Sequence, residues 1–289
     1  MSTPRPLDVA KLRAYRIPSL KAQYDARDAI IYALGCGAGL ADIDETELIY
    51  EKRLKTLPTM AVVLGRGDLW CMDPDAGLDW PQILHAGQRL ALFKPLAAQG
   101  SISTKSEILE ISDKGPGKPA LIAARRTVFD VAGDVIAEIE EVWIVRGAGG
   151  FGGERAFNFM PADPLPARAP DLSLVLPTAK NQAMLYRLSG DLNPLHVEPE
   201  VSRLGGFDRP VLHGLSTMGL ACRALTHQVC AGDPAAIQAM SVRFTAPVWP
   251  GETIRTDFWT GADRIRFRAV AVERNEIVLD EGSAALSKS

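Results

Sequence analysis

The chain has 289 residues, of which 47% are hydrophobic and 23% charged, a composition typical of a globular protein with a sizeable core. Its formal net charge of -3 at pH 7 argues against nucleic acid or anionic lipid as a partner, and no run of residues approaches the ~20 apolar positions of a membrane span. The N-terminal segment has charges and prolines where a secretion signal needs an apolar run, and the four cysteines lack C-x-x-C spacing, so we expect a cytoplasmic protein with reduced thiols.

The first half of the chain contains a meander of three predicted strands. They are rich in β-branched residues, are separated by the turn-forming segments "DKGPGK" and "VAGD", and cover residues 101–112, 119–130 and 135–145. Residues 146–170 are then rich in glycine and proline and predict a boundary. The "GAGGFG" within them fits G-x-G-x-x-G, but prolines follow where a dinucleotide site needs a helix, so we interpret it as linker.

The second half repeats this pattern. Its three predicted strands cover residues 253–261, 263–273 and 276–286. The segments that lead into the two meanders, "LFKPLAAQGSI" and "RFTAPVWPGETI", align Phe93 with Phe244, and at similar distances before them Tyr32 aligns with Tyr186. This self-similarity predicts two α+β units, each a curved antiparallel sheet with helical material packed on one side.

A helix of about four turns is predicted in the second half, in "GLSTMGLACRALTHQVCAG". Its apolar positions are spaced to form one face, and it begins at the His213-Gly214 pair, so we expect it to fill the concave face of its sheet. The first peptide N–H groups, at and just after Gly214, have no partner within a helix and lie at the positive end of its dipole. They therefore form a site for a negative oxygen.

The stretch "YRLSGDLNPLH" places Asp191, Asn193 and His196 close together. Pro194 disfavours helical backbone at Asn193, so the loop can direct Asp191 and His196 into one cavity; the alternative is an Asx-type turn with a surface histidine. In the first half Gly37 aligns with Asp191, and no amide or imidazole follows it, which predicts one active site per chain. A carboxylate, an imidazole and an oxyanion site together suit acid–base chemistry next to a carbonyl.

These residues resemble a known family. "YRLSGDLNPLH" followed by "GFDRPVLHGLSTMG" is similar to the signature of the type-2 (R-specific) enoyl-CoA hydratases, the MaoC-like branch of the hotdog fold, which includes the hydratase domain of the peroxisomal multifunctional enzyme. "LPTMAVVLG", "ILHAGQRLALFKPL", "GGFGG" and "RFTAPVWPGE" extend the resemblance over nearly the whole chain. It implies a double hotdog with a long central helix in the C-terminal unit. Residues 1–146 would form a non-catalytic, acyl-chain-binding unit, 147–170 a linker and 171–289 the catalytic unit.

The resemblance also implies roles for individual residues. The catalytic pair of the family's D-x-N-P-L-H motif matches Asp191 and His196, and the oxyanion donor matches the backbone N–H of Gly214. Asn193 could orient water or the carboxylate through its amide. The residues implied to contact the substrate are His85, Ala86, Lys114, Leu192, Pro194, Leu195 and Phe244.

The reaction implied is reversible hydration of a trans-2-enoyl-CoA to the (3R)-3-hydroxyacyl-CoA by a homodimer. It needs no metal or separate cofactor, because coenzyme A is part of the substrate. We expect burial against the apolar helix to raise the pKa of Asp191, unless proton removal is concerted with the attack of water. Two other function classes stay open. One is a thioesterase or passive acyl-CoA binder, and the other is a metal-dependent oxygenase that uses Asp191, His196 and His213.

Overall fold

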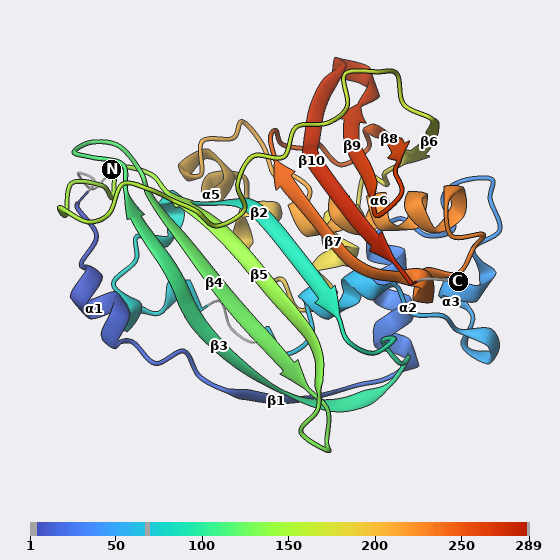
Figure 1. Cartoon of the computed structure of the whole chain (residues 1–289), viewed down its shortest axis with the longest axis horizontal. Coiled ribbons are helices and arrows are strands. Elements are labelled where there is room, and N and C mark those ends of the chain that lie inside the picture. Colours follow the sequence, from blue (N-terminus) through green and yellow to red (C-terminus); the bar gives the residue numbers. More distant parts are fainter. Residues whose placement is uncertain (1–4, 67–69, 288–289) are drawn as a thin grey trace.

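The structure, a computed structural model, describes residues 5–66 and 70–287. Within these ranges ten strands form one antiparallel sheet, in the order β1-β3-β4-β5-β2-β7-β10-β9-β8-β6. Figure 1 shows the green strands of the first half beside the red and orange strands of the second half. The two halves join where β2 pairs with β7, from Gly87 opposite Arg243 to Ala91 opposite Ala239.

The two halves of the sheet have the same topology. The strands of the first half are β1 Leu20–Tyr24, β2 Ile83–Leu92, β3 Gly100–Asp113, β4 Ala120–Phe129 and β5 Val135–Val145. Those of the second half are β6 Leu172–Pro177, β7 Ile237–Phe244, β8 Thr253–Thr260, β9 Ile265–Ala271 and β10 Glu276–Leu286. Each strand of the first half has a counterpart five numbers later in the second half, so that β1 corresponds to β6 and β2 to β7. Counted inward from the two edges of the sheet, the corresponding strands occur in the same order. The six predicted strands correspond to β3, β4, β5, β8, β9 and β10.

The longest helix is α6, which lies behind the red strands in Figure 1. They are α1 Val9–Ala14, α2 Ala26–Gly35, α3 Thr46–Ile49, α4 Gln182–Tyr186, α5 Pro199–Leu204 and α6 Gly214–Gln228. Every residue of α6 from Leu215 to Thr226 is buried, so the predicted core helix is confirmed, although it ends four residues before Gly232. No helix in the described ranges is long and apolar enough to cross a membrane.

The two aligned tyrosines meet in the core between the halves. Tyr32 on α2 and Tyr186 at the end of α4 are both fully buried, and their ring centroids lie 5.8 Å apart. Close approach of α6 to the end of α2 depends on Gly219, because a Cβ there would lie 2.2 Å from Sγ of Cys36. The helical material of the two units therefore shares one core.

A buried ion pair also joins the halves. Arg223 on α6 donates from Nε to Oε1 of Glu45 at 2.7 Å and from Nη2 to Oε2 at 2.5 Å. Its Nη1 donates to the carbonyl of Cys36 at 2.7 Å. Both charged side chains are completely buried, so each depends on the other for its stabilisation.

The Gly-rich segment after β5 is a loop, as interpreted from the sequence, with no helix or strand before β6. The carboxylate of Asp113 accepts hydrogen bonds from the N–H groups of Gly115 at 2.8 Å, Gly150 at 2.7 Å and Gly152 at 2.7 Å. These bonds, that from Gly150 above all, lower the pKa of Asp113 to about 2. The loop thus binds the chain's own carboxylate with the donors that a dinucleotide site would offer to phosphate.

Candidate active site

The loop that carries Asp191 follows α4 and is turned by Gly190, whose φ of +111° favours glycine. Asn193 has the non-helical backbone expected before a proline, with φ -53° and ψ 119°, and its Oδ1 accepts the N–H of Leu195 at 3.0 Å. The Asx-type turn is therefore present. Asp191 is nevertheless buried, with 5% of its surface exposed, and His196 is partly buried, so the loop directs both side chains inward.

His213 holds the two candidate catalytic residues together. Its ring stacks on the ring of His196 with centroids 3.7 Å apart. Its Nε2 lies 3.1 Å from the backbone carbonyl of Asp191, to which it donates a hydrogen bond. His213 is almost fully buried and directly precedes Gly214. It serves as the packed, hydrogen-bonding residue that links the loop to the start of α6.

The contacts of His196 fix its tautomer. Its Nδ1 lies 2.9 Å from the carbonyl of Val211, which can only accept a hydrogen bond, so Nδ1 carries the proton and Nε2 is an acceptor. Burial lowers the pKa of His196, and the nearby charge of Asp191 offsets this only in part. His196 is thus neutral near pH ~7, with a free basic nitrogen.

Asp191 has a partner that the sequence analysis missed. Its Oδ2 accepts a hydrogen bond from Nη1 of Arg66 at 3.0 Å. Burial alone would raise the pKa of Asp191, but the charges of Arg66 and, to a smaller extent, His213 and His196 outweigh it and hold the pKa below its usual range. The expectation of a raised pKa is therefore wrong. Oδ1 has no hydrogen-bond partner in the part of the chain that the structure describes.

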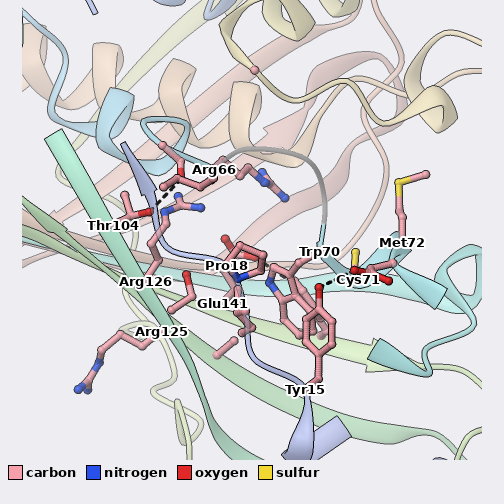
Figure 2. Close-up of a pocket in the computed structure, with 18 of the residues that line it drawn as sticks. Tyr15, Pro18, Arg66, Trp70, Cys71, Met72, Thr104, Arg125, Arg126 and Glu141 are labelled. Atoms are coloured by element: carbon pink, nitrogen blue, oxygen red, sulfur yellow. Dashed lines mark hydrogen bonds between the residues drawn. The ribbon is translucent and has the colours of Figure 1, made fainter. Parts of the chain in front are cut away.

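A cavity of about 710 Å³ borders the Asp191 loop. Leu192 and Pro194 of the loop line it, together with Arg66 and the aromatic side chains of Trp70 and Trp143 from the first half. Figure 2 shows Trp70 packed against Tyr15, with Arg66, Arg126 and Glu141 on the other side. The cavity has the size of a typical small-molecule site and combines apolar walls with a few polar groups.

Arg126 and Glu141 were also not predicted as site residues, although the charges within the predicted strands gave an indication of them. Each belongs to a pair of like charges within a predicted strand, Arg125-Arg126 in β4 and Glu140-Glu141 in β5. Since successive side chains of a strand point to opposite faces, one member of each pair must point to the covered side of the sheet.

Gly214 begins α6 as predicted. The N–H groups of Ser216 and Thr217 donate to the carbonyl of His213, whereas that of Gly214 has no partner among the described residues. A Cβ at Gly214 would lie 2.9 Å from two ring carbons of Phe244, whose ring centroid is 4.9 Å from that of His85. The structure thus brings His85 and Phe244 together beside the free N–H.

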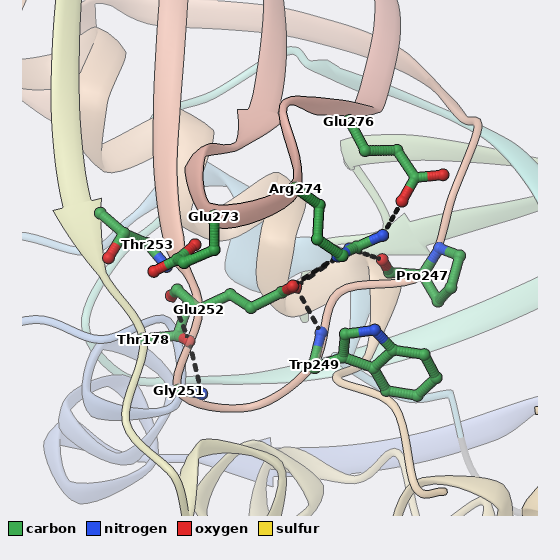
Figure 3. Close-up of polar contacts among 9 residues, drawn as sticks. All are labelled: Thr178, Pro247, Trp249, Gly251, Glu252, Thr253, Glu273, Arg274 and Glu276. Atoms are coloured by element: carbon green, nitrogen blue, oxygen red, sulfur yellow. Dashed lines mark hydrogen bonds and ion pairs between the residues drawn. The ribbon is translucent and has the colours of Figure 1, made fainter. Parts of the chain in front are cut away.

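The segment after Phe244 is held rigidly by Glu252 (Figure 3). The carboxylate of Glu252 accepts hydrogen bonds from the N–H of Trp249 at 2.8 Å and from Nε of Arg274 at 2.5 Å. Its backbone carbonyl accepts from Oγ1 of Thr178 at 2.7 Å, and Nη2 of Arg274 donates to Pro247 at 2.7 Å. The "PVWPGE" motif therefore anchors the segment that begins at Phe244.

Three other residues implied to contact the substrate, Ala86, Leu195 and Lys114, do not line the cavity. Ala86 occupies a register shift of β2 against β5, between His85 and Gly87. The carbonyl of Leu195 accepts a hydrogen bond from Oγ of Ser202 at 2.5 Å. Lys114 donates from Nζ to the carbonyl of Arg155 at 2.6 Å and does not line the cavity.

The equivalent position in the first half would hold a side chain only under strain and close to its neighbours. Gly37, which aligns with Asp191, has φ +84°. A Cβ there would lie 3.1 Å from Nη1 of Arg223 and 3.2 Å from Oε1 of Gln182. An aspartate at Gly37 would be both strained and crowded, which is consistent with a single site per chain.

The geometry does not suit a metal-dependent oxygenase. Nδ1 of His196 and Nε2 of His213 each donate to a backbone carbonyl, and the two rings are stacked, so their remaining nitrogens do not converge with Asp191 on a common point. Across residues 5–66 and 70–287, no group of three His, Cys, Asp or Glu side chains is placed to hold a metal ion.

Comparison with known proteins gives matches to both halves. Residues 162–282 match the family described as "MaoC like domain", and residues 22–147 match "MFE-2 hydratase 2 N-terminal domain". The chain is 38% identical over 275 residues to 3-hydroxyacyl-thioester dehydratase Y of Mycobacterium tuberculosis, covering 90% of this chain and 92% of that protein. It is 34% identical over 278 residues to the peroxisomal multifunctional enzyme type 2 of Drosophila melanogaster, covering 92% of this chain but only 46% of that longer protein.

Solved structures agree with these matches. A MaoC-like dehydratase from Phytophthora capsici superposes with a TM-score of 0.84 and 33% identity over 98% of this chain and 100% of the other. A Mycobacterium tuberculosis protein described as a double hotdog superposes with a TM-score of 0.57 over 99% of both chains; at 17% identity this likeness concerns the fold alone. The predicted α+β double hotdog is confirmed, with the added finding that both units share one continuous sheet.

Proposed function

The chain belongs to the MaoC-like family of hydratases and dehydratases, and on this premise we propose that it catalyses the reversible hydration of trans-2-enoyl-CoA to (3R)-3-hydroxyacyl-CoA in fatty acyl metabolism. The observation that carries the proposal is the arrangement around His213, which contacts both Asp191 and His196 and directly precedes the free N–H of Gly214. A base, a carboxylate and an oxyanion donor therefore lie within one small region, next to a cavity that suits an acyl tail.

In the proposed reaction, Nε2 of His196 accepts a proton from water as the water oxygen forms a bond to C3. The electron pair of the double bond moves toward C2 and the thioester oxygen, where the N–H of Gly214 donates a hydrogen bond to the developing charge. The proton on His196 then passes to C2, so that one molecule of water is added in total. The reaction involves no electron transfer and needs no group beyond the coenzyme A carried by the substrate.

The charge states of Asp191 and His196 support one of the two as the proton carrier. The depressed pKa of Asp191 makes its protonated form scarce, so it is a weak base and an unavailable acid at neutral pH. His196 is neutral with a free nitrogen and can gain and lose a proton in that range. We therefore assign proton transfer to His196. Asp191 orients the water and stabilises the imidazolium that forms, and the amide of Asn193 assists in this orientation.

The experiment that tests the function is a hydration assay with trans-2-enoyl-CoA thioesters of several lengths. We expect loss of the enoyl absorbance and a product of R configuration in chiral analysis. Release of free thiol without loss of this absorbance would instead indicate a thioesterase. Binding with neither reaction would indicate a passive acyl-CoA binder.

The same assay tests the residues. Asp191→Asn and His196→Gln should each lower kcat by ~10²–10⁴-fold without loss of fold. His227→Gln, which changes a histidine in the last turn of α6, is the matched control and should keep the rate. Near-normal turnover in either of the first two variants would refute their assignment. A cytoplasmic location and a homodimer remain predictions.

A further inference from the structure

Two charged side chains, Arg126 and Glu141, are buried at the cavity, and a third, Arg66, is mostly buried; a plain hydrocarbon tail could form no hydrogen bond with any of them. Arg126 on β4 pairs with Ile139 on β5, and Glu141 lies two residues further along β5, so Arg126 and Glu141 are diagonal neighbours on one face of the sheet. Arg126 is 7% exposed and Glu141 8% exposed. Arg66 lies at the same cavity (Figure 2). Its Nη1 donates a hydrogen bond to Oδ2 of Asp191.

These groups have more hydrogen-bonding capacity than the described residues use. Arg126 donates from Nη2 to the carbonyl of Val62 at 2.5 Å, while its Nε is buried without a partner. Glu141 accepts one hydrogen bond, from Nε1 of Trp143 at 3.1 Å, and forms no direct ion pair with either arginine in this part of the chain. A guanidinium has five N–H donors, and a buried donor left unpaired costs ~1–3 kcal/mol. Burial with so little compensation lowers the pKa of Arg126 to about 10.

The charges of the cluster balance. Arg66 and Arg126 supply two positive charges, and Asp191 and Glu141 supply two negative ones, because the arginines hold the pKa of each acid below its usual value despite burial. His85, which also faces Glu141, has its pKa lowered by burial and is neutral near pH ~7. A carboxylate on the tail would therefore add an uncompensated buried charge.

The other charged side chains at the cavity are already paired. Asp73 accepts a hydrogen bond from Oη of Tyr15 at 2.8 Å. Arg125 donates to Glu140 at 2.6 Å, and Figure 2 shows it directed away from Arg66 and Arg126. Neither changes the balance between the two arginines and the two acids.

We propose that the cavity binds an acyl tail bearing a neutral oxygen, a hydroxyl or keto group, which accepts hydrogen bonds from Arg66 and Arg126. A hydroxyl can in addition donate to the carboxylate of Glu141. This inference rests on the proposed function, since it names the substrate class of the same site. A saturated tail of equal length is disfavoured because it leaves the buried donors unpaired and displaces any water that serves them.

The test compares kcat/KM for a plain trans-2-enoyl-CoA with thioesters of the same length that carry one hydroxyl or keto group at successive tail positions, or a terminal carboxylate. The wild type should prefer at least one hydroxyl or keto thioester to the plain one by ~10-fold or more, the ratio that corresponds to one satisfied buried donor. A wild type that prefers the plain tail to every oxygenated one overturns the proposal. So does a wild type that prefers the carboxylate.

Two variants test which side chains cause the preference for an oxygenated tail. Arg126→Met should remove most of it, whereas the control Arg89→Met, at an arginine of β2 that pairs with Glu140 and does not line the cavity, should keep it. Glu141→Gln keeps the shape of the side chain and serves if Arg126→Met fails to fold. It should reduce the advantage of a hydroxyl more than that of a keto group, because only the hydroxyl donates to the carboxylate. Equal losses for plain and oxygenated thioesters in both variants would overturn the assignment.

Failure of this inference is distinguishable from failure of the proposed function. If plain enoyl-CoA is hydrated and oxygenated thioesters are poor substrates, only the tail preference is wrong. If no enoyl-CoA is hydrated, calorimetry with the saturated, non-reactive acyl-CoA analogues still measures the preference through Kd. Equal Kd values for plain and oxygenated analogues would then count against it.

Discussion

Nη1 of Arg66 lies 3.0 Å from Oδ2 of Asp191, although 125 residues separate the two in the chain. The contact joins the first half of the molecule to the Asp191 loop of the second. It also sets the charge state of the loop, because the burial that would raise the pKa of Asp191 is outweighed by the guanidinium. The first half therefore contributes to the electrostatics of the site as well as to the walls of the cavity.

Replacing Arg66 should move the acid limb of the pH profile. In the wild type, activity should fall as His196 becomes protonated, at a pH below the ordinary histidine value because burial lowers the pKa of His196. Without the guanidinium, burial raises the pKa of Asp191, and His196 also gains basicity, so both residues are protonated at higher pH. Arg66→Met should thus shift the acid limb of kcat/KM to higher pH, and Arg66→Lys should shift it less. Identical profiles for wild type and Arg66→Met would contradict this role.

Adding a methyl group at Gly214 should disturb the oxyanion site through Phe244. The new Cβ would lie 2.9 Å from two carbons of the Phe244 ring, so the ring must move. A misplacement of ~1 Å in an active site can lower the rate ~10²-fold, so we expect the movement of the ring in Gly214→Ala to lower kcat by ~10-fold or more. Adding Phe244→Leu makes room for the methyl and should recover part of the loss. Unchanged kinetics in Gly214→Ala would show that this contact does not position the donor.

The repeated strand patterns could be predicted from the sequence because the segments of β3, β4, β5 and β8, β9, β10 are rich in β-branched residues and are bounded by turn formers. The central strands β2 and β7 were missed, since "HAGQ" and the segments leading into the meanders carry weaker strand patterns. Motifs within one loop singled out Asp191 and His196 as candidates. The charge state of Asp191 could not be predicted, because it depends on Arg66, which tertiary contact alone brings to the site.

One acyl-CoA should bind per chain. The position that corresponds to Asp191 in the first half is Gly37, where a side chain would meet Arg223 and Gln182. The first half also lacks counterparts of Asn193 and His196. Calorimetric titration with a non-reactive saturated acyl-CoA analogue should therefore saturate at one equivalent per chain, and His196→Gln should retain this stoichiometry. Saturation at two equivalents would require a second site in the first half.

The ion pair between Arg223 and Glu45 should dominate the acid stability of the junction between the halves. Arg223→Met leaves a buried carboxylate uncompensated and should lower the free energy of unfolding by ~3–5 kcal/mol at neutral pH. Although burial would raise it, His227 and Arg223 lower the pKa of Glu45 to about 2 in the folded chain, against ~4.3 when unfolded. The stabilisation is thus fully present above pH ~4.3 and is lost as the pH falls toward 2, so the difference between wild type and variant in urea unfolding should shrink progressively between pH ~4.3 and pH ~2. Arg125→Met, which breaks a partly exposed pair with Glu140, is the control and should cost ~1 kcal/mol or less. A difference between wild type and Arg223→Met that stays constant with pH would show that the loss comes from packing and not from charge.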